Sequence, residues 1–144
     1  MSKRLALRNK LRTMTSKIEI FIPVKPVSAS RPRVTNFGAY YSESYMAYRK
    51  DMHEFLKLIR AKYPVREKVL FEVHAEFICY KPKKPSNPEC PRYDLDNMEK
   101  ALYDAITYSK MIWHDDIQIV KNRNSKRYQK EGESFGTKIT IIEL

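Results

Sequence analysis

Val69-Leu-Phe-Glu-Val-His-Ala-Glu-Phe-Ile-Cys79 decides the fold class, because it is the most regular alternating run in the sequence. Every second residue from Val69 to Cys79 is apolar, and the residues between them are polar at the centre of the run. This alternation predicts a strand with one face buried in a core. Ile18, Ile20 and Ile22 alternate in the same way, and residues 138–144 predict a closing strand.

Two segments outside these strands have the three- and four-residue spacing of helices. The first helix is expected to begin at Ser42 or Ser44 and to end before Pro64. Its apolar stripe comprises Tyr45, Tyr48, Met52, Phe55 and Ile59. The second helix is expected to begin after Asp94, a good capping residue. Its apolar face comprises Leu95, Met98, Leu102, Ala105 and Ile106. The pattern predicts a single α/β (α+β) domain, with a small mixed sheet packed against two main helices.

The overall charge favours a polyanionic partner. The 144 residues carry a formal net charge of +11 and suit one domain. Nucleic acid is the commonest such partner, and an anionic membrane surface is the rival. No apolar run approaches the roughly 20 residues that a membrane helix needs, and no secretory signal pattern is present. We therefore expect a cytoplasmic protein with no membrane partner.

Small residues and cysteines exclude several chemistries. The three glycines, Gly38, Gly132 and Gly136, are spaced too widely for a dinucleotide fingerprint or a Walker loop, so we expect no nucleotide cofactor. The two cysteines, Cys79 and Cys90, do not form a CxxC pair and are expected to be free thiols.

Three segments are basic. Residues 1–17 contain six Lys or Arg and no acid, and form a predicted arm, either a solvated tail or a tether to phosphates, ahead of a domain at 18–144. Arg31 and Arg33 lie in a loop suited to phosphate contact, before a short hairpin predicted at 34–41. The third segment carries Lys121, Arg123, Lys126 and Arg127. It is either a charged edge strand or a track for the DNA backbone, and the presence of three basic segments favours the track.

Aspartates suggest a metal site inside this basic chain. Asp94 and Asp96 flank the start of the second helix. There they cap the helix, serve as ordinary surface charge, or bind a cation. Asp115 and Asp116 follow the helix, and a return turn is expected to bring Asp116 back towards the helix start. Three or four carboxylates meeting in space suit Mg²⁺, which prefers oxygen ligands and promotes phosphodiester hydrolysis.

The helix face that carries Asp96 adds a cation to this site. Lys100 lies one turn after Asp96 and is expected to share its face with Tyr103 and Asp104. Its ammonium is suited to neutralising charge on a phosphate under attack. His114 is a weaker ligand candidate, because none of the three histidines pairs at ligand spacing, and zinc is disfavoured for that reason.

Asp94-Leu-Asp-Asn-Met-Glu-Lys100, followed by Ala105 and Asp115-Asp116, resembles the RusA family of Holliday-junction resolvases. The resemblance covers residues 18–144. It implies a homodimer of small α/β subunits that cuts four-way DNA junctions with Mg²⁺, for which Mn²⁺ substitutes, in DNA recombination and repair. It implies that Asp94, Asp96 and Asp116 bind metal, with Asp115 as a further candidate, and that Lys100 is catalytic. Members are often encoded by phages or prophages of bacterial cells.

Two alternatives remain at this point. A basic module that binds nucleic acid without cutting it would explain the charge, but it has no need of an acidic cluster. A related metal nuclease acting on other branched DNA would use the same residues, and only the family resemblance favours junctions.

Overall fold

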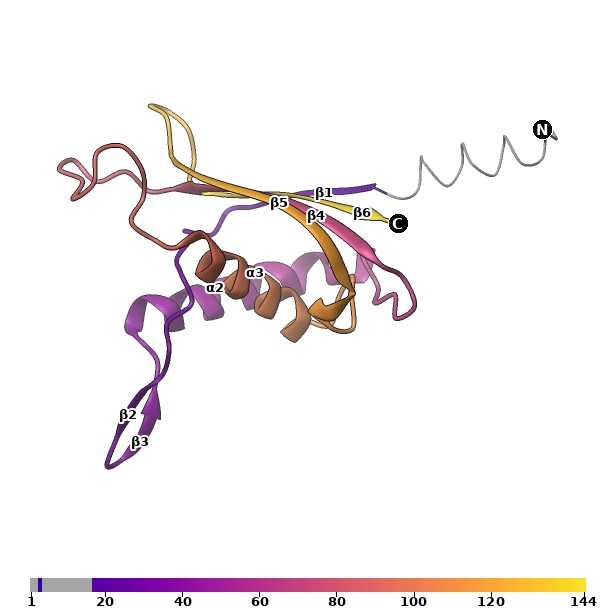
Figure 1. The fold of residues 1–144 in the computed structure, drawn as a ribbon, viewed down its shortest axis with the longest axis horizontal. Coiled ribbons are helices and arrows are strands. Elements are labelled where there is room, and N and C mark those ends of the chain that lie inside the picture. Colours follow the sequence, from indigo (N-terminus) through magenta and orange to yellow (C-terminus); the bar gives the residue numbers. More distant parts are fainter. Residues whose placement is uncertain (1–2, 4–16) are drawn as a thin grey trace.

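The computed structural model describes Lys3 and residues 17–144. Within residues 17–144, eight strands and α-helices follow one another (Figure 1). They are β1 (Lys17–Ile22), β2 (Arg33–Thr35), β3 (Gly38–Tyr40), α2 (Glu43–Ile59), β4 (Phe71–Cys79), α3 (Leu95–Tyr108), β5 (Ile119–Tyr128) and β6 (Gly136–Glu143). A single 3₁₀ turn, η1 (Arg60–Lys62), follows α2, and another, η2 (Asp116–Gln118), precedes β5.

The main sheet is mixed, as the sequence predicts. Its strand order is β1-β6-β4-β5, and only the β4–β5 pair is parallel. A parallel pair needs a long crossover, which here contains the loop after β4 and helix α3. The architecture of one mixed sheet and two main helices is confirmed.

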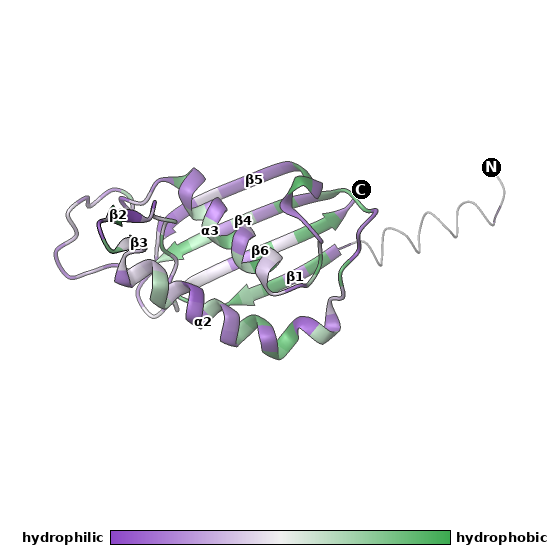
Figure 2. Cartoon of the chain, turned by 90° about the horizontal axis from the view of Figure 1, so that it is seen from below, coloured by the Kyte–Doolittle hydropathy of each residue, from purple (hydrophilic) through white to green (hydrophobic). Residues whose placement is uncertain are grey.

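Both helices lie on one face of the sheet (Figure 2). Alternate β4 residues from Phe71 to Cys79 point towards them and are buried, which confirms the predicted pattern. Helix α2 buries Tyr45, Tyr48, Met52 and Leu56. Phe55 and Ile59, predicted in the same stripe, are only half-buried at the rim of the core, because α2 is rolled so that Leu56 faces the sheet.

The predicted hairpin forms and extends away from the sheet and helices (Figure 1). Strands β2 and β3 pair with each other and with no other strand. The tip is stabilised by the hydroxyl of Thr35, which accepts a hydrogen bond from the backbone N–H of Phe37. Gly38 has a φ of 118°, a conformation that L-residues rarely adopt, so the turn requires glycine there.

Several other expectations are decided by the structure. Ile117 lies in η2 and is 80% exposed, because the chain makes one more turn before β5. Cys79 and Cys90 are free, and burial raises the pKa of the Cys79 thiol to about 11.

Apart from Lys3 and Lys17, the predicted basic arm lies outside the described residues. In the described part of the chain, no helix is long and apolar enough to cross a membrane.

Candidate active site

The start of α3 presents two exposed carboxylates. Asp94 occupies the N-cap position with extended backbone, but its side chain accepts no capping hydrogen bond from the helix. It instead lies 3.5 Å from the side-chain amide of Asn97. Asp96 is in the first turn and is also exposed. Asp94 is therefore the N-cap residue, as predicted, but its side chain makes no capping hydrogen bond. Both carboxylates stay accessible to a ligand.

A lysine–aspartate pair occupies the middle of α3. The Nζ atom of Lys100 donates to Oδ2 of Asp104 at 3.2 Å. This hydrogen bond is the main reason why the pKa of Lys100 is raised, and Asp116 adds a smaller attraction. The pair is exposed and contributes little to stability, but it fixes the position of the ammonium group.

The aspartates after the helix return to this lysine. Burial is the largest cause that raises the pKa of Asp116, followed by its hydrogen bond and charge repulsion with Asp115 and by repulsion from Asp104. Lys100 acts in the opposite direction. Asp116 therefore lies within electrostatic range of the middle of α3. Asp104, which the sequence placed only on the same helix face as Lys100, belongs to this group.

Gln118 holds the turn that carries these aspartates. Its side-chain carbonyl accepts hydrogen bonds from the backbone N–H groups of His114 and Asp115, at 2.8 and 3.2 Å. Its amide nitrogen donates to the carbonyls of Arg66 and Val69, at 2.7 and 2.8 Å. Gln118 is only 7% exposed. Gln118 was not among the predicted site residues, although aspartate followed three residues later by glutamine is a capping-box spacing.

The carboxylate of Asp115 completes this turn. It accepts a hydrogen bond from the N–H of Ile117 at 3.0 Å, which is the largest cause of the lowered pKa of Asp115. Asp115 is therefore engaged in local structure, whereas the carboxylate of Asp116 accepts no hydrogen bond from the backbone of this turn. His114 is exposed, and it is its backbone that binds Gln118.

Two long-range contacts position the start of α3. The ammonium of Lys126 donates to the carbonyls of Pro91 and Tyr93, at 2.9 and 2.6 Å, and so anchors the chain just before Asp94. On the other side, the N–H of Ala29 donates to the carbonyl of Asn97 at 2.9 Å. This bond places the loop that leads to Arg31 and Arg33 beside the first turn of α3.

Tyr103 does not share the exposed face of Lys100, contrary to expectation. It is 8% exposed, and its ring packs edge-on against Trp113. Its hydroxyl accepts hydrogen bonds from the amides of Asn122 and Asn124, at 3.2 and 2.9 Å. The physical reason is that edge strand β5 covers this border of α3 and supplies both amides.

The predicted basic track on β5 divides between the two faces of the sheet. Lys121 and Arg123 are exposed. In the register of the two strands they pair with Glu72 and His74 of β4. These two β4 residues alternate with the residues that are buried under the helices. Lys121 and Arg123 therefore lie on the face opposite to α3. Lys121 also lies 3.6 Å from the carboxylate of Glu72. Lys126 points to the helix side, where it holds the loop before Asp94.

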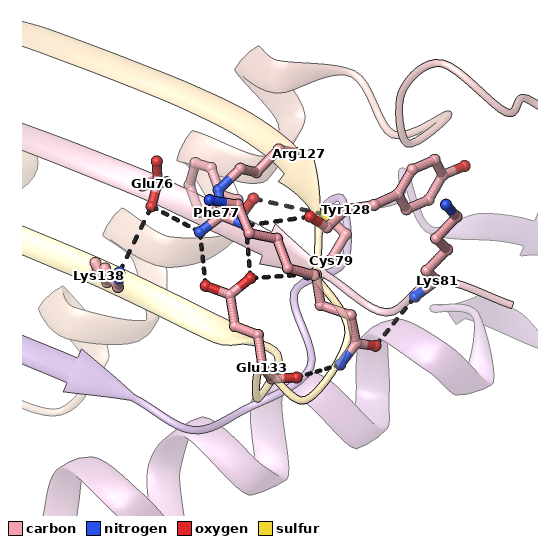
Figure 3. A network of polar contacts seen from close by, with 10 residues as sticks. Glu76, Phe77, Cys79, Lys81, Arg127, Tyr128, Glu133 and Lys138 are labelled. Carbon is pink, nitrogen blue, oxygen red and sulfur yellow. Dashed lines mark hydrogen bonds and ion pairs between the residues drawn. The ribbon is translucent and has the colours of Figure 1, made fainter.

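Arg127 is the centre of an ion-pair network (Figure 3). Its two terminal nitrogens donate to the carboxylate of Glu133 at 2.6 and 2.8 Å, and Glu76 lies 3.4 Å away. A paired, bidentate guanidinium of this kind orders the loop between β5 and β6. Arg127 is thus occupied by carboxylates, while Arg31 and Arg33 at the hairpin are exposed.

The Arg127–Glu133 pair gives stability a specific pH dependence. Arg127 is the main cause that lowers the pKa of Glu133 to about 2, from an ordinary value of 4.5. The ionised carboxylate therefore stabilises the fold above pH 4.5, and that contribution is lost as the pH falls towards about 2. We expect Glu133→Gln to flatten the change in unfolding free energy over this interval, measured by urea unfolding at several pH values. Glu131→Gln, an exposed neighbour, is the control, and equal slopes in all three proteins would contradict the assignment.

The donor groups suit a hard divalent cation. Mg²⁺ commonly takes one or two protein carboxylates and completes its shell with water and phosphate. Repulsion among Asp104, Asp115 and Asp116 is of the kind that a cation relieves. Among residues 17–144, no group of three or more His, Cys, Asp or Glu side chains is close enough to hold a metal ion. A common site formed by Asp94, Asp96 and Asp116 thus stays a prediction.

These features define a class of protein. A strongly basic α+β domain, with exposed aspartates and a fixed lysine along one helix, has the groups of an enzyme that hydrolyses phosphodiesters. The family model described as endodeoxyribonuclease RusA matches residues 23–142. The chain belongs to this family of endodeoxyribonucleases, and the resemblance noted in the sequence is confirmed. In the comparison with curated proteins, no sequence matched.

Proposed function

We propose that the protein is a Mg²⁺-dependent endonuclease that resolves four-way DNA junctions in recombination and repair, with Mn²⁺ able to substitute. The observation that carries the proposal is the family match, because residues 23–142 include all four proposed site residues, Asp94, Asp96, Lys100 and Asp116. The electrostatic attraction between Asp116 and Lys100 gives further support.

Each proposed site residue has a definite task. Asp94, Asp96 and Asp116 would supply carboxylate oxygens to the metal, and Asp115 would orient Asp116 through the turn that they share. When bound, Mg²⁺ lowers the pKa of a water ligand and stabilises the leaving oxygen. Lys100, held by Asp104, would stabilise negative charge on the phosphate as water adds to phosphorus and the bond to one deoxyribose oxygen breaks.

Substrate binding is proposed to use the basic loop beside the site. Arg31 and Arg33 are exposed, and the loop before them is hydrogen-bonded to the first turn of α3. Their guanidinium groups would contact phosphates flanking the cut. Lys121 and Arg123 would serve a DNA arm that reaches the opposite face of the sheet. Lys126 and Arg127 are instead proposed to order the loops that they hold.

A homodimer suits the reaction, because symmetric resolution needs two equivalent active sites related by a two-fold axis. The proposal places this dimer in the cytoplasm of a bacterial cell, with a phage or prophage as a source for the gene.

Substrate choice and metal dependence are tested together on a panel of labelled DNAs. Four-way junction, flap and linear duplex of matched sequence are incubated with Mg²⁺, Mn²⁺, Ca²⁺ or EDTA. The proposal predicts cutting of the junction with Mg²⁺ or Mn²⁺ and none with EDTA. Preferred cutting of flaps would show that the enzyme acts on another kind of branched DNA. Binding without cutting under all conditions would favour a non-catalytic binding module.

The basic arm is proposed to tether the enzyme to DNA. Deleting residues 1–16, which keeps β1 intact, removes five of the basic side chains. We expect weaker junction binding and a shallower dependence of affinity on salt, by about 0.9 in log–log slope for each lost phosphate contact. Fluorescence anisotropy over a series of salt concentrations measures this slope. An unchanged slope would make the segment a solvated tail.

A further inference from the structure

A groove of about 580 Å³ lies between α2 and α3, and the proposed chemistry does not use it. Its lining includes Tyr41, Tyr45, Arg49, His53, Tyr108 and Ser109. Its size falls within the range of small-ligand sites, which is roughly 300–1,000 Å³. Its lining combines aromatic rings with cationic groups.

Aromatic rings and a guanidinium group lie close together along one wall. The guanidinium of Arg49 lies 5.3 Å from the ring centre of Tyr41 and 5.8 Å from that of Tyr45. Further along, the rings of His53 and Tyr108 meet edge-on at 5.6 Å. Tyr108 is 68% exposed, so its ring is available to a ligand. Nucleobases stack on aromatic and arginine planes of this kind.

Ser109, one of the residues that line the groove, has a buried hydroxyl without a hydrogen-bond partner. Ser109 is 3% exposed, and its Oγ atom is the only buried side-chain N or O atom in the described part of the chain that lacks a hydrogen bond. Buried polar groups nearly always have a partner. A ligand that offers an amide, amino or carbonyl group would supply the missing hydrogen bond.

The groove adjoins the candidate active site. Asp104 is one of its lining residues and is also the partner of Lys100. The same carboxylate is the second cause, after burial, of the raised pKa of Tyr45. A group bound in the groove would therefore lie next to the proposed site of cleavage, while Arg49 and Lys50 provide positive charge for its phosphate.

We propose that this groove binds an unpaired nucleobase of the DNA substrate, beside the phosphodiester that is cut. The base stacks on the tyrosine and arginine planes, and its polar edge is hydrogen-bonded by Ser109. Single-stranded DNA offers such bases without the cost of breaking a pair, whereas in a four-way junction a base must first leave its pair, at a cost of a few kcal/mol. The proposed location beside a cut bond rests on the proposed function, but the binding of a base does not.

The test compares a short fluorescent oligothymidylate with the same oligonucleotide carrying abasic residues at its centre, in EDTA so that cleavage plays no part. The parent protein should bind the strand that has bases more tightly, by about tenfold for one stacked base. Tyr41→Ala should abolish this preference and Tyr41→Phe should keep it. Tyr80→Ala, which removes an exposed tyrosine outside the groove, is the matched control and should keep it as well.

Ser109→Ala separates ligand binding from a structural role. Since the hydroxyl has no partner within the fold, the variant should unfold at the same temperature as the parent or higher, yet lose affinity for the strand that has bases. Equal binding of normal and abasic strands by the parent would overturn the inference. So would a Tyr41→Ala variant that keeps the preference but sediments as a smaller species, which would make the groove a subunit interface. Normal junction cutting alongside either result would leave the proposed function intact.

Discussion

Asp96→Asn should abolish cleavage of a four-way junction while leaving junction binding unchanged or tighter. The carboxylate lies in the first turn of α3, one turn before Lys100, and is proposed to hold the metal. Its loss should lower the cleavage rate by at least about 10²-fold, the scale seen when one electrostatic group of an active site is removed. Binding should not weaken, because the substitution removes a negative charge that repels phosphate. Single-turnover cleavage and anisotropy titrations measure the two effects.

Asp51→Asn is the matched control. Asp51 is exposed on α2, so the substitution makes the same change in charge outside the proposed site. Since Asp96 is also exposed, neither variant should alter the melting temperature appreciably. Cleavage by Asp96→Asn at the rate of the parent protein would remove Asp96 from the catalytic group and would return the aspartates of α3 to surface charge.

Gln118→Leu is the second variant with a large expected effect, this time on both stability and activity. The substitution keeps the approximate size of the side chain but removes four hydrogen bonds, two to backbone N–H groups and two to carbonyls. Leaving buried polar groups unsatisfied should destabilise the fold by about 2–3 kcal/mol. The turn that carries Asp116 should also loosen, and misplacement by about 1 Å typically costs 10²-fold in rate. Urea unfolding and cleavage assays test the two effects.

Gln129→Leu provides the comparison for this variant. The Gln129 side chain accepts from the N–H of Lys81 at 3.1 Å and donates to the carbonyl of Glu133 at 2.7 Å, in the network around Arg127. Its loss should lower stability less than the loss of Gln118 and should leave cleavage by the folded protein intact. If Gln118→Leu cut DNA as fast as Gln129→Leu when both are folded, Gln118 would have no role in positioning the aspartates.

Strands and helices were predictable where a local pattern determines burial. The alternation of β4 predicted which face packs under the helices, and the stripe of α3 predicted the buried Met98, Leu102 and Ile106. These predictions succeed because a period of two or of 3.6 residues is enough to separate two faces. At the rim of the core the same reasoning fails. Tyr103 is buried only because β5 covers it, and the sequence does not state which strand lies there.

Candidate site residues were predictable by type but not by partner. The spacing of Asp94, Asp96, Lys100 and Asp116 predicted a group of carboxylates and one cation near the start of the helix. The pairing of Asp104 with Lys100 depends on the rotamers that the two side chains adopt. The hydrogen bond from Lys126 to the carbonyl of Tyr93 joins residues 33 positions apart, which a local pattern does not reveal. Arg127 was predicted to belong to a basic segment, but no local pattern identifies the carboxylate of Glu133 that pairs with it.

Cleavage of a synthetic four-way junction, labelled in turn on each of its four strands, tests the central claim most directly. The reaction is run with and without Mg²⁺ beside a linear duplex of the same sequence. The proposal predicts paired nicks at symmetric positions in two opposite strands, dependent on the metal, and an uncut duplex. Tight binding to the junction with no nicks in either Mg²⁺ or Mn²⁺ would contradict it.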